Sequence, residues 1–96
     1  MSEHALEPGT VPRLSPMFRF QWEEAQECHV LLYPEGMVKL SPSAGEILKR
    51  VDGKTSIEGI IESLKAQFPG VPLEGDVHQF LEAAYGHGWL RSVDAW

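Results

Sequence analysis

The sequence predicts a small α+β domain in which a three-stranded antiparallel sheet is followed by three helices. Between residues 18 and 40, an alternating apolar segment and a short continuous apolar run, separated by turn residues, are typical of strands. Between residues 41 and 86 they follow the period of amphipathic helices. Glycines and prolines separate most of these segments, as they do at turns and helix ends. With 96 residues the chain has the size of one domain with a modest core.

The predicted strands are joined by short turns. Residues 18–22 alternate between apolar and polar side chains, as in a strand with one buried face. Residues 28–33 are apolar on both faces, which is typical of a strand buried on both sides or one that offers an apolar face to a partner. A turn at 34–36 (PEG) leads to a short third strand at 37–40. Such short connections predict an antiparallel meander.

Each predicted helix has capping residues at one or both ends. The expected helices run from the cap Ser41 to Asp52-Gly53, from the cap Thr55 or Ser56 to Pro69-Gly70, and from Leu73 or Glu74 to Gly86 or Gly88. The last two form a helix-turn-helix pair beside the sheet, so the expected fold is winged helix-turn-helix-like. We expect residues 1–16 to be a flexible N-terminal arm, residues 17–91 to be the domain and residues 92–96 to be a tail.

The charge and composition of the chain disfavour several classes of function. The chain carries 14 acidic and 8 basic residues, a net charge of −6, which disfavours binding to nucleic acid and to anionic membranes. Its single cysteine, Cys28, allows no internal disulfide. The sequence shows neither a secretory signal nor an apolar run long enough to span a membrane. We therefore expect a cytoplasmic protein.

No residue set in the sequence matches a catalytic or metal-binding pattern. The four histidines, His4, His29, His78 and His87, lack the spacing of metal ligands. Cys28 lies among apolar residues, where a buried thiol is common and a nucleophile would need a base and an orienting group. Glycine-rich phosphate-binding motifs are absent from the sequence. We expect no enzyme activity, no catalytic residue, no metal and no cofactor.

Three binding functions follow from the predicted fold. A winged-helix regulator would place the third helix in DNA, but this helix contains three acidic residues and no Lys or Arg. A dimerisation domain would use the apolar face of residues 28–33 or an exchanged arm, so a monomer and a homodimer both stay open. A peptide-binding domain would use the outer strand at 37–40, where an extended peptide can add as a further strand.

The run LLYPEG at 31–36, followed by Leu40, Ser43-Ala44, Ile47-Leu48 and Asp52-Gly53, resembles the PqqD family of pyrroloquinoline quinone biosynthesis. The resemblance covers about residues 12–90. It implies a peptide-recognition domain of ribosomal-peptide modification systems, without catalytic activity or cofactor. It further implies a chaperone that binds the precursor peptide PqqA and delivers it to PqqE, a radical S-adenosylmethionine enzyme. That enzyme cross-links a glutamate and a tyrosine of the peptide.

The resemblance also implies where the peptide lies, between the third strand and the third helix. On this chain the strand side of the groove is Met37, Val38, Lys39 and Leu40. The helix side carries Val77, Phe80, Leu81, Ala84 and Tyr85, several of which must fill the core. We therefore expect His78, Glu82 and Tyr85 to reach the peptide from the helix. A Val38→Pro substitution is expected to abolish strand addition while the helices stay folded.

Overall fold

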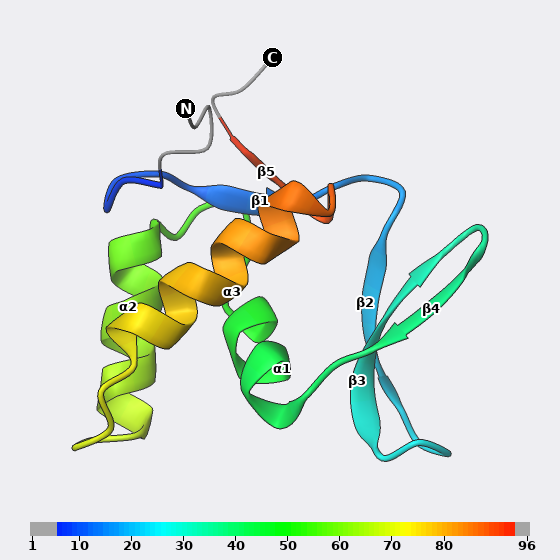
Figure 1. The fold of residues 1–96 in the computed structure, drawn as a ribbon, viewed down its shortest axis with the longest axis horizontal. Helices are drawn as coiled ribbons and strands as arrows, with labels where there is room; N and C mark the ends of the chain where they lie inside the picture. Colours follow the sequence, from blue (N-terminus) through cyan, green and yellow to red (C-terminus); the bar gives the residue numbers. More distant parts are fainter. Residues whose placement is uncertain (1–5, 94–96) are drawn as a thin grey trace.

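The computed structural model describes residues 6–93 and shows a small sheet set to one side of three helices (Figure 1). The elements are β1 (Pro12–Leu14), β2 (Arg19–Glu23), β3 (Cys28–Tyr33), β4 (Gly36–Lys39), α1 (Pro42–Lys49), α2 (Ile57–Gln67), α3 (Glu74–Gly86) and β5 (Leu90–Ser92). Strands β2, β3 and β4 form an antiparallel sheet in that order. The predicted α+β, winged-helix-like fold is confirmed. Residues 1–5 of the predicted arm, His4 among them, and residues 94–96 of the tail lie outside the described residues.

The central strand β3 joins the sheet to the helices. Its neighbours Val30 and Leu31 point to opposite faces of the sheet, and both side chains are 0% exposed. Leu31 belongs to one core that all three helices share. The buried core residues are Leu31, Leu40, Ala44, Ile47, Leu48, Ile57, Ile60, Ile61, Leu64, Val77, Leu81, Ala84 and Leu90. The sequence expectation of a strand with two apolar faces thus corresponds to the middle strand of the sheet.

Strands β1 and β5 were not expected from the sequence. They pair antiparallel, with Leu14 opposite Leu90, and bring the two ends of the domain together. The hydroxyl of the buried Ser15 donates to the carbonyl of Gly88 at 2.8 Å and ties this pair to the end of α3. Each strand has only three residues, too few to show a hydrophobic period. The predicted arm therefore includes β1, and the predicted tail includes the last residue of β5.

Backbone contacts hold residues 8–10 against the beginning of α2. The first N–H groups of a helix have no partner within the helix. In α2 the N–H of Ile57 donates to the carbonyl of Thr10 at 2.8 Å, and the N–H of Glu58 donates to the carbonyl of Pro8 at 3.0 Å. The Ser56 hydroxyl, the predicted cap, accepts from the next free N–H, that of Gly59, at 3.1 Å. This part of the predicted arm is thus a cap for α2.

Helix α1 is shorter than the sequence predicts. It begins as expected, with the Ser41 hydroxyl accepting from the N–H of Ala44 at 3.2 Å, but it ends at Lys49 and not near residue 52. The N–H groups of Arg50 and Val51 donate to carbonyls three residues back, which tightens the last turn. Beyond it, the Asp52 carboxylate accepts from two following N–H groups and turns the chain toward α2.

The close packing of α1 on β3 leads to a stability prediction. A methyl group on Gly45 would lie 2.9 Å from Nδ1 of His29, closer than real side chains come. The His29 ring stacks on Phe20 at 4.8 Å and meets Trp22 edge-on at 5.1 Å, which restricts its movement. Overpacking costs about 1–3 kcal/mol, whereas alanine gains about 1 kcal/mol in helix propensity. We expect Gly45→Ala to lower the free energy of unfolding by about 1 kcal/mol in urea titration.

A second helical glycine provides the matched control. Gly75 lies in α3 with nothing within 4 Å of the position of an added methyl group. Gly75→Ala should therefore raise the free energy of unfolding by up to about 1 kcal/mol. If Gly45→Ala were as stabilising as Gly75→Ala, the contact between α1 and the sheet would be looser than described.

Candidate functional site

The outer strand β4 has an open backbone edge. It pairs with β3 on one side, and no other described strand pairs with it. Leu40, just after β4, donates its N–H to the carbonyl of His29 at 3.0 Å. Backbone groups alternate in direction along an antiparallel strand, so Val38, like Leu40, bonds to β3. The N–H and C=O groups of Met37 and Lys39 therefore point to the open edge.

The side chains of the predicted strand residues divide between the two faces of the sheet. Leu40 is 6% exposed and belongs to the core, and the half-buried Val38 packs against that core. Met37 and Lys39 lie on the opposite face and are exposed. Thus Met37 and Lys39 have backbone groups at the open edge that a ligand strand could pair with, while Val38 and Leu40 direct apolar side chains toward the core.

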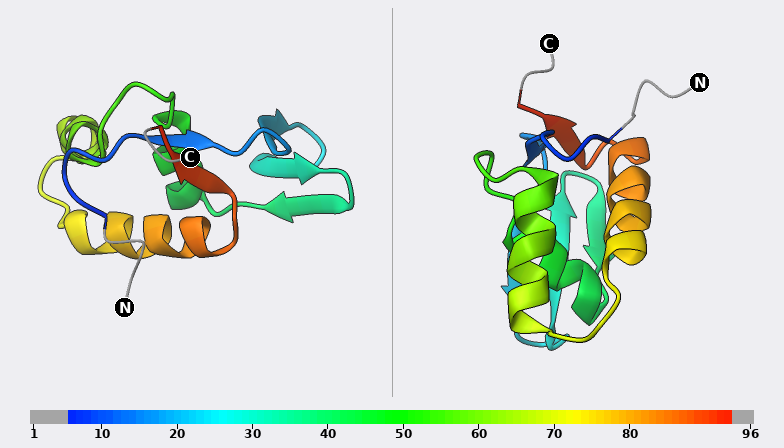
Figure 2. Two further views of the ribbon diagram at one scale, coloured as in Figure 1. Left: turned by 90° about the horizontal axis from the view of Figure 1, so that it is seen from above. Right: turned by 90° about the vertical axis from the view of Figure 1, so that its left-hand side faces the viewer.

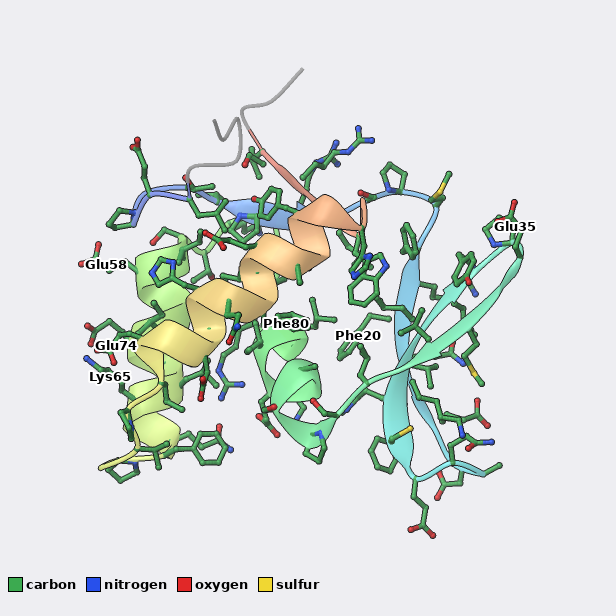
Figure 3. The ribbon with its side chains drawn as sticks, viewed as in Figure 1. Phe20, Glu35, Glu58, Lys65, Glu74 and Phe80 are labelled. Carbon is green, nitrogen blue, oxygen red and sulfur yellow. The ribbon has the colours of Figure 1, made fainter. Side chains whose placement is uncertain are left out.

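An apolar pocket of about 460 Å³ begins two residues after the end of β4. One part of its lining is Ser41, Pro42 and Ser43, which follow β4 after Leu40. Another part comes from α3, through Val77 and Phe80. Viewed from above, β4 is the outer strand on the same side of the molecule as α3 (Figure 2). Phe80 faces the space between the helices and the sheet, with Phe20 of β2 across from it (Figure 3).

The three α3 residues that were expected to reach the peptide lie on the other flank of the helix. His78 borders a second, smaller pocket of about 200 Å³ formed with α2 and Pro8. The Tyr85 hydroxyl shares a hydrogen bond of 2.9 Å with that of Ser92 in β5. Glu82 is exposed, and the helical period places it on this same flank. The structure therefore does not bring His78, Glu82 and Tyr85 together with β4.

Two side chains of α3, Asp76 and Phe80, border the main pocket. From the sequence, Phe80 was expected on the helix side of the groove but not among the residues that reach the peptide, and Asp76 was not expected there. They lie one turn apart on the flank that borders the main pocket, next to the core residue Val77. Their spacing of four residues was visible in the sequence. Which flank of α3 faces the sheet was not, because that depends on the positions of α1 and β4.

The rim of the main pocket is acidic. Glu46 of α1 and Asp76 of α3 both line it. A hydrogen bond from Arg50 holds the pKa of Glu46 below its ordinary value of 4.5. Asp76 is exposed, and among the described residues it forms no ion pair. Helix α3 contains no Lys or Arg, which also disfavours its use as a DNA-recognition helix.

Other site classes find no support in residues 6–93. No group of three or more His, Cys, Asp or Glu side chains in this range is placed to hold a metal ion. No helix in the same range has the length and hydrophobicity that crossing a membrane requires. An open strand edge beside an apolar pocket defines a recognition domain for an extended peptide.

Comparison with known proteins identifies the family. The sequence model of the family described as coenzyme PQQ synthesis protein D (PqqD) matches residues 28–90. The PqqA binding protein of Pseudomonas aeruginosa is 55% identical over 83 residues, covering 85% of this chain and 90% of that protein. The PqqA binding protein of Azotobacter vinelandii is 53% identical over 92 residues, covering 95% and 98%. The chain belongs to the PqqD family.

A solved structure shows the same fold. The solution structure of the PqqD part of Methylobacterium extorquens PqqCD has a TM-score of 0.77 and 30% identity, covering 95% of this chain and 99% of that one. It is described as a functional, stand-alone recognition element for ribosomally synthesised and modified peptides. These matches confirm the family resemblance seen in LLYPEG and the residues after it. The description of its family assigns the chain to the synthesis of coenzyme PQQ.

The position of Tyr85 leads to a prediction on pH dependence. Burial raises the pKa of Tyr85 above its ordinary value of 10.0, and the hydrogen bond with Ser92 partly offsets this. The folded chain thus keeps the proton to a higher pH than the unfolded chain, so stability falls as the pH rises past about 10. We expect the free energy of unfolding to fall more steeply above about pH 10 in the wild type than in Tyr85→Phe. If urea titration gave the same pH dependence for the wild type and for Tyr85→Phe, the Tyr85 hydroxyl would not be buried as described.

Proposed function

We propose that this chain binds the precursor peptide PqqA as an added strand on β4 and presents it to the radical S-adenosylmethionine enzyme PqqE in the cytoplasm. The observation that carries the proposal is the open edge at Met37 and Lys39. Strand β4 is on the same side of the molecule as α3, and it ends two residues before the first residue of the main pocket (Figure 2). The names of the curated relatives, PqqA binding proteins, support the choice of ligand.

Strand addition provides affinity through the backbone. In an antiparallel arrangement, Met37 and Lys39 can each exchange two hydrogen bonds with a ligand residue. These bonds are independent of ligand sequence, so side-chain pockets must supply the selectivity. The half-buried Val38 and the pocket beyond Ser41 offer the ligand's inward side chains an apolar environment. An extended peptide of a few residues fits this arrangement better than a folded domain.

Presentation requires that one side of the bound peptide stay accessible. The sheet stands to one side of the helices (Figure 2), and Met37 and Lys39 are exposed on its face away from the core. A bound strand would show its outward side chains on this face. Holding the peptide extended near the enzyme raises its local concentration at the enzyme's active site. The chain would then contribute binding and conformation, and PqqE the chemistry.

The edge can be tested with a proline at position 39. The N–H of Lys39 points away from β3, so Lys39→Pro removes a donor from the open edge while the described ladder bonds stay in place. We expect at least about tenfold weaker binding of PqqA by calorimetry, with an unchanged helical circular dichroism spectrum. Lys39→Ala keeps the N–H group and is the matched control, which should bind within about threefold of the wild type.

The register also corrects the expectation for Val38→Pro. The N–H of Val38 belongs to the ladder with β3, so a proline there would break the sheet itself and could not separate binding from folding. Equal PqqA binding by Lys39→Pro and Lys39→Ala would contradict strand addition.

Delivery of the peptide to PqqE can be measured separately from binding. The cross-linking of PqqA by PqqE should be supported by the wild type and by Lys39→Ala, and should fall with Lys39→Pro by about the factor seen in binding. The measurement is product yield by mass spectrometry at peptide concentrations below the dissociation constant. If PqqE modified the peptide equally well without this chain, the presenting role would be wrong.

A further inference from the structure

The main pocket has a defined position relative to the bound strand. Strand β4 runs from Gly36 at the hairpin turn to Lys39, and the pocket begins two residues later at Ser41. Two residues of strand correspond to about 7 Å. A peptide on β4 would therefore pass over the mouth of the pocket as it leaves the edge.

The direction of the peptide follows from the sheet. Strands β2, β3 and β4 are all antiparallel to their neighbours, and an added strand extends this pattern most readily in the antiparallel direction. Such a peptide runs from the α1 end of β4 toward the hairpin turn. The segment near the pocket is then N-terminal to the segment that pairs with Met37 and Lys39.

The pocket has the chemistry of a side-chain anchor site. Its volume of about 460 Å³ lies within the range of ligand pockets. Most of its lining is apolar, from Ile47, Leu64, Phe68 and Phe80, and three helices contribute to it. At the rim, Glu46 is already paired with Lys49 and Arg50, whereas Asp76 forms no ion pair among the described residues. A cation next to the anchor would complement Asp76.

We propose that this pocket selects the ligand by holding a large apolar side chain that lies about two or three residues N-terminal to the β4-paired segment, with a Lys or Arg of the peptide beside Asp76. The proposal rests on strand addition at β4 and adds to it the position, polarity and direction of the recognised sequence. The edge then provides affinity that is independent of sequence, and the pocket determines which peptide residues pair with Met37 and Lys39.

The test fills the pocket from two walls without touching the core. Ser43 is exposed at the start of α1, and Val71, 48% exposed, lies in the loop before α3. We expect Ser43→Trp and Val71→Trp each to weaken PqqA binding about tenfold by calorimetry, the value of one buried apolar side chain. Ala66→Trp is the matched control, since Ala66 is exposed on α2 outside the pocket lining and should bind as the wild type does.

Alanine substitutions along PqqA locate the anchor. Alanine at one apolar position N-terminal to the paired segment should weaken binding to the wild type about tenfold. The same peptide change should weaken binding to Ser43→Trp less than about twofold, because the pocket of that variant is already filled. The anchor proposal is wrong if both tryptophan variants bind PqqA within about twofold of the wild type while Lys39→Pro has lost binding. If the proposed function itself were wrong, the wild type would not bind PqqA.

The rim charge is tested separately. Asp76→Lys should weaken PqqA binding about two- to fivefold at low salt, and about 1 M salt should remove the difference. Glu24→Lys, a charge reversal in the exposed β2–β3 turn, is the control for net charge and should bind more tightly than Asp76→Lys. Equal affinities of these two variants for PqqA would mean that Asp76 does not interact with the peptide.

Discussion

The contact between α1 and the central strand is the constraint on which the rest of the structure depends. Gly45 allows the helix to approach the His29 ring, which is itself held by Phe20 and Trp22. Since β4 pairs only with β3 among the described strands, this contact fixes where the open edge of β4 lies relative to the helices. The main pocket lies just beyond, between α1 and α3. A small shift of α1 would change both the edge and the pocket.

The helices are in turn held by contacts between segments that are distant in the sequence. The Arg50 guanidinium donates to Ser63 at 2.9 Å and also to Gln67, which joins the end of α1 to α2. The carbonyls of residues 8 and 10 cap α2, and the β1–β5 pair holds the end of α3. The chain ends thus set the position of α3, and with it the flank that Phe80 and Asp76 present to the pocket.

These long-range contacts explain how much could be predicted from the sequence. Local signals such as the Ser41 and Ser56 caps and the alternation around β2 were sufficient for the sheet and for the start of two helices. The β1–β5 pair joins opposite ends of the chain and has no local signal. The hydrophobic period of α3 identified its buried side but not its neighbours. Phe80 was expected on the helix side of the groove, but the period could not show that the flank of Asp76 and Phe80 borders the main pocket while His78 borders a smaller one. The edge strand could be found from the sequence, whereas the helix side of the site required the three-dimensional arrangement.

An open strand edge does not distinguish one sequence from another, because its donors and acceptors belong to the backbone. A long apolar edge would also pair with other chains and aggregate. Here β4 has four residues and carries the exposed Lys39, both of which limit unselective pairing. A short edge, however, provides few hydrogen bonds, so it cannot retain a peptide tightly by itself. If a peptide pairs with β4 as proposed, its selectivity must come from nearby side chains, and the apolar pocket with its acidic rim, which begins two residues after β4, can supply it. The same division would suit the proposed role as a carrier, since a modest number of backbone hydrogen bonds would leave the peptide free to pass to an enzyme.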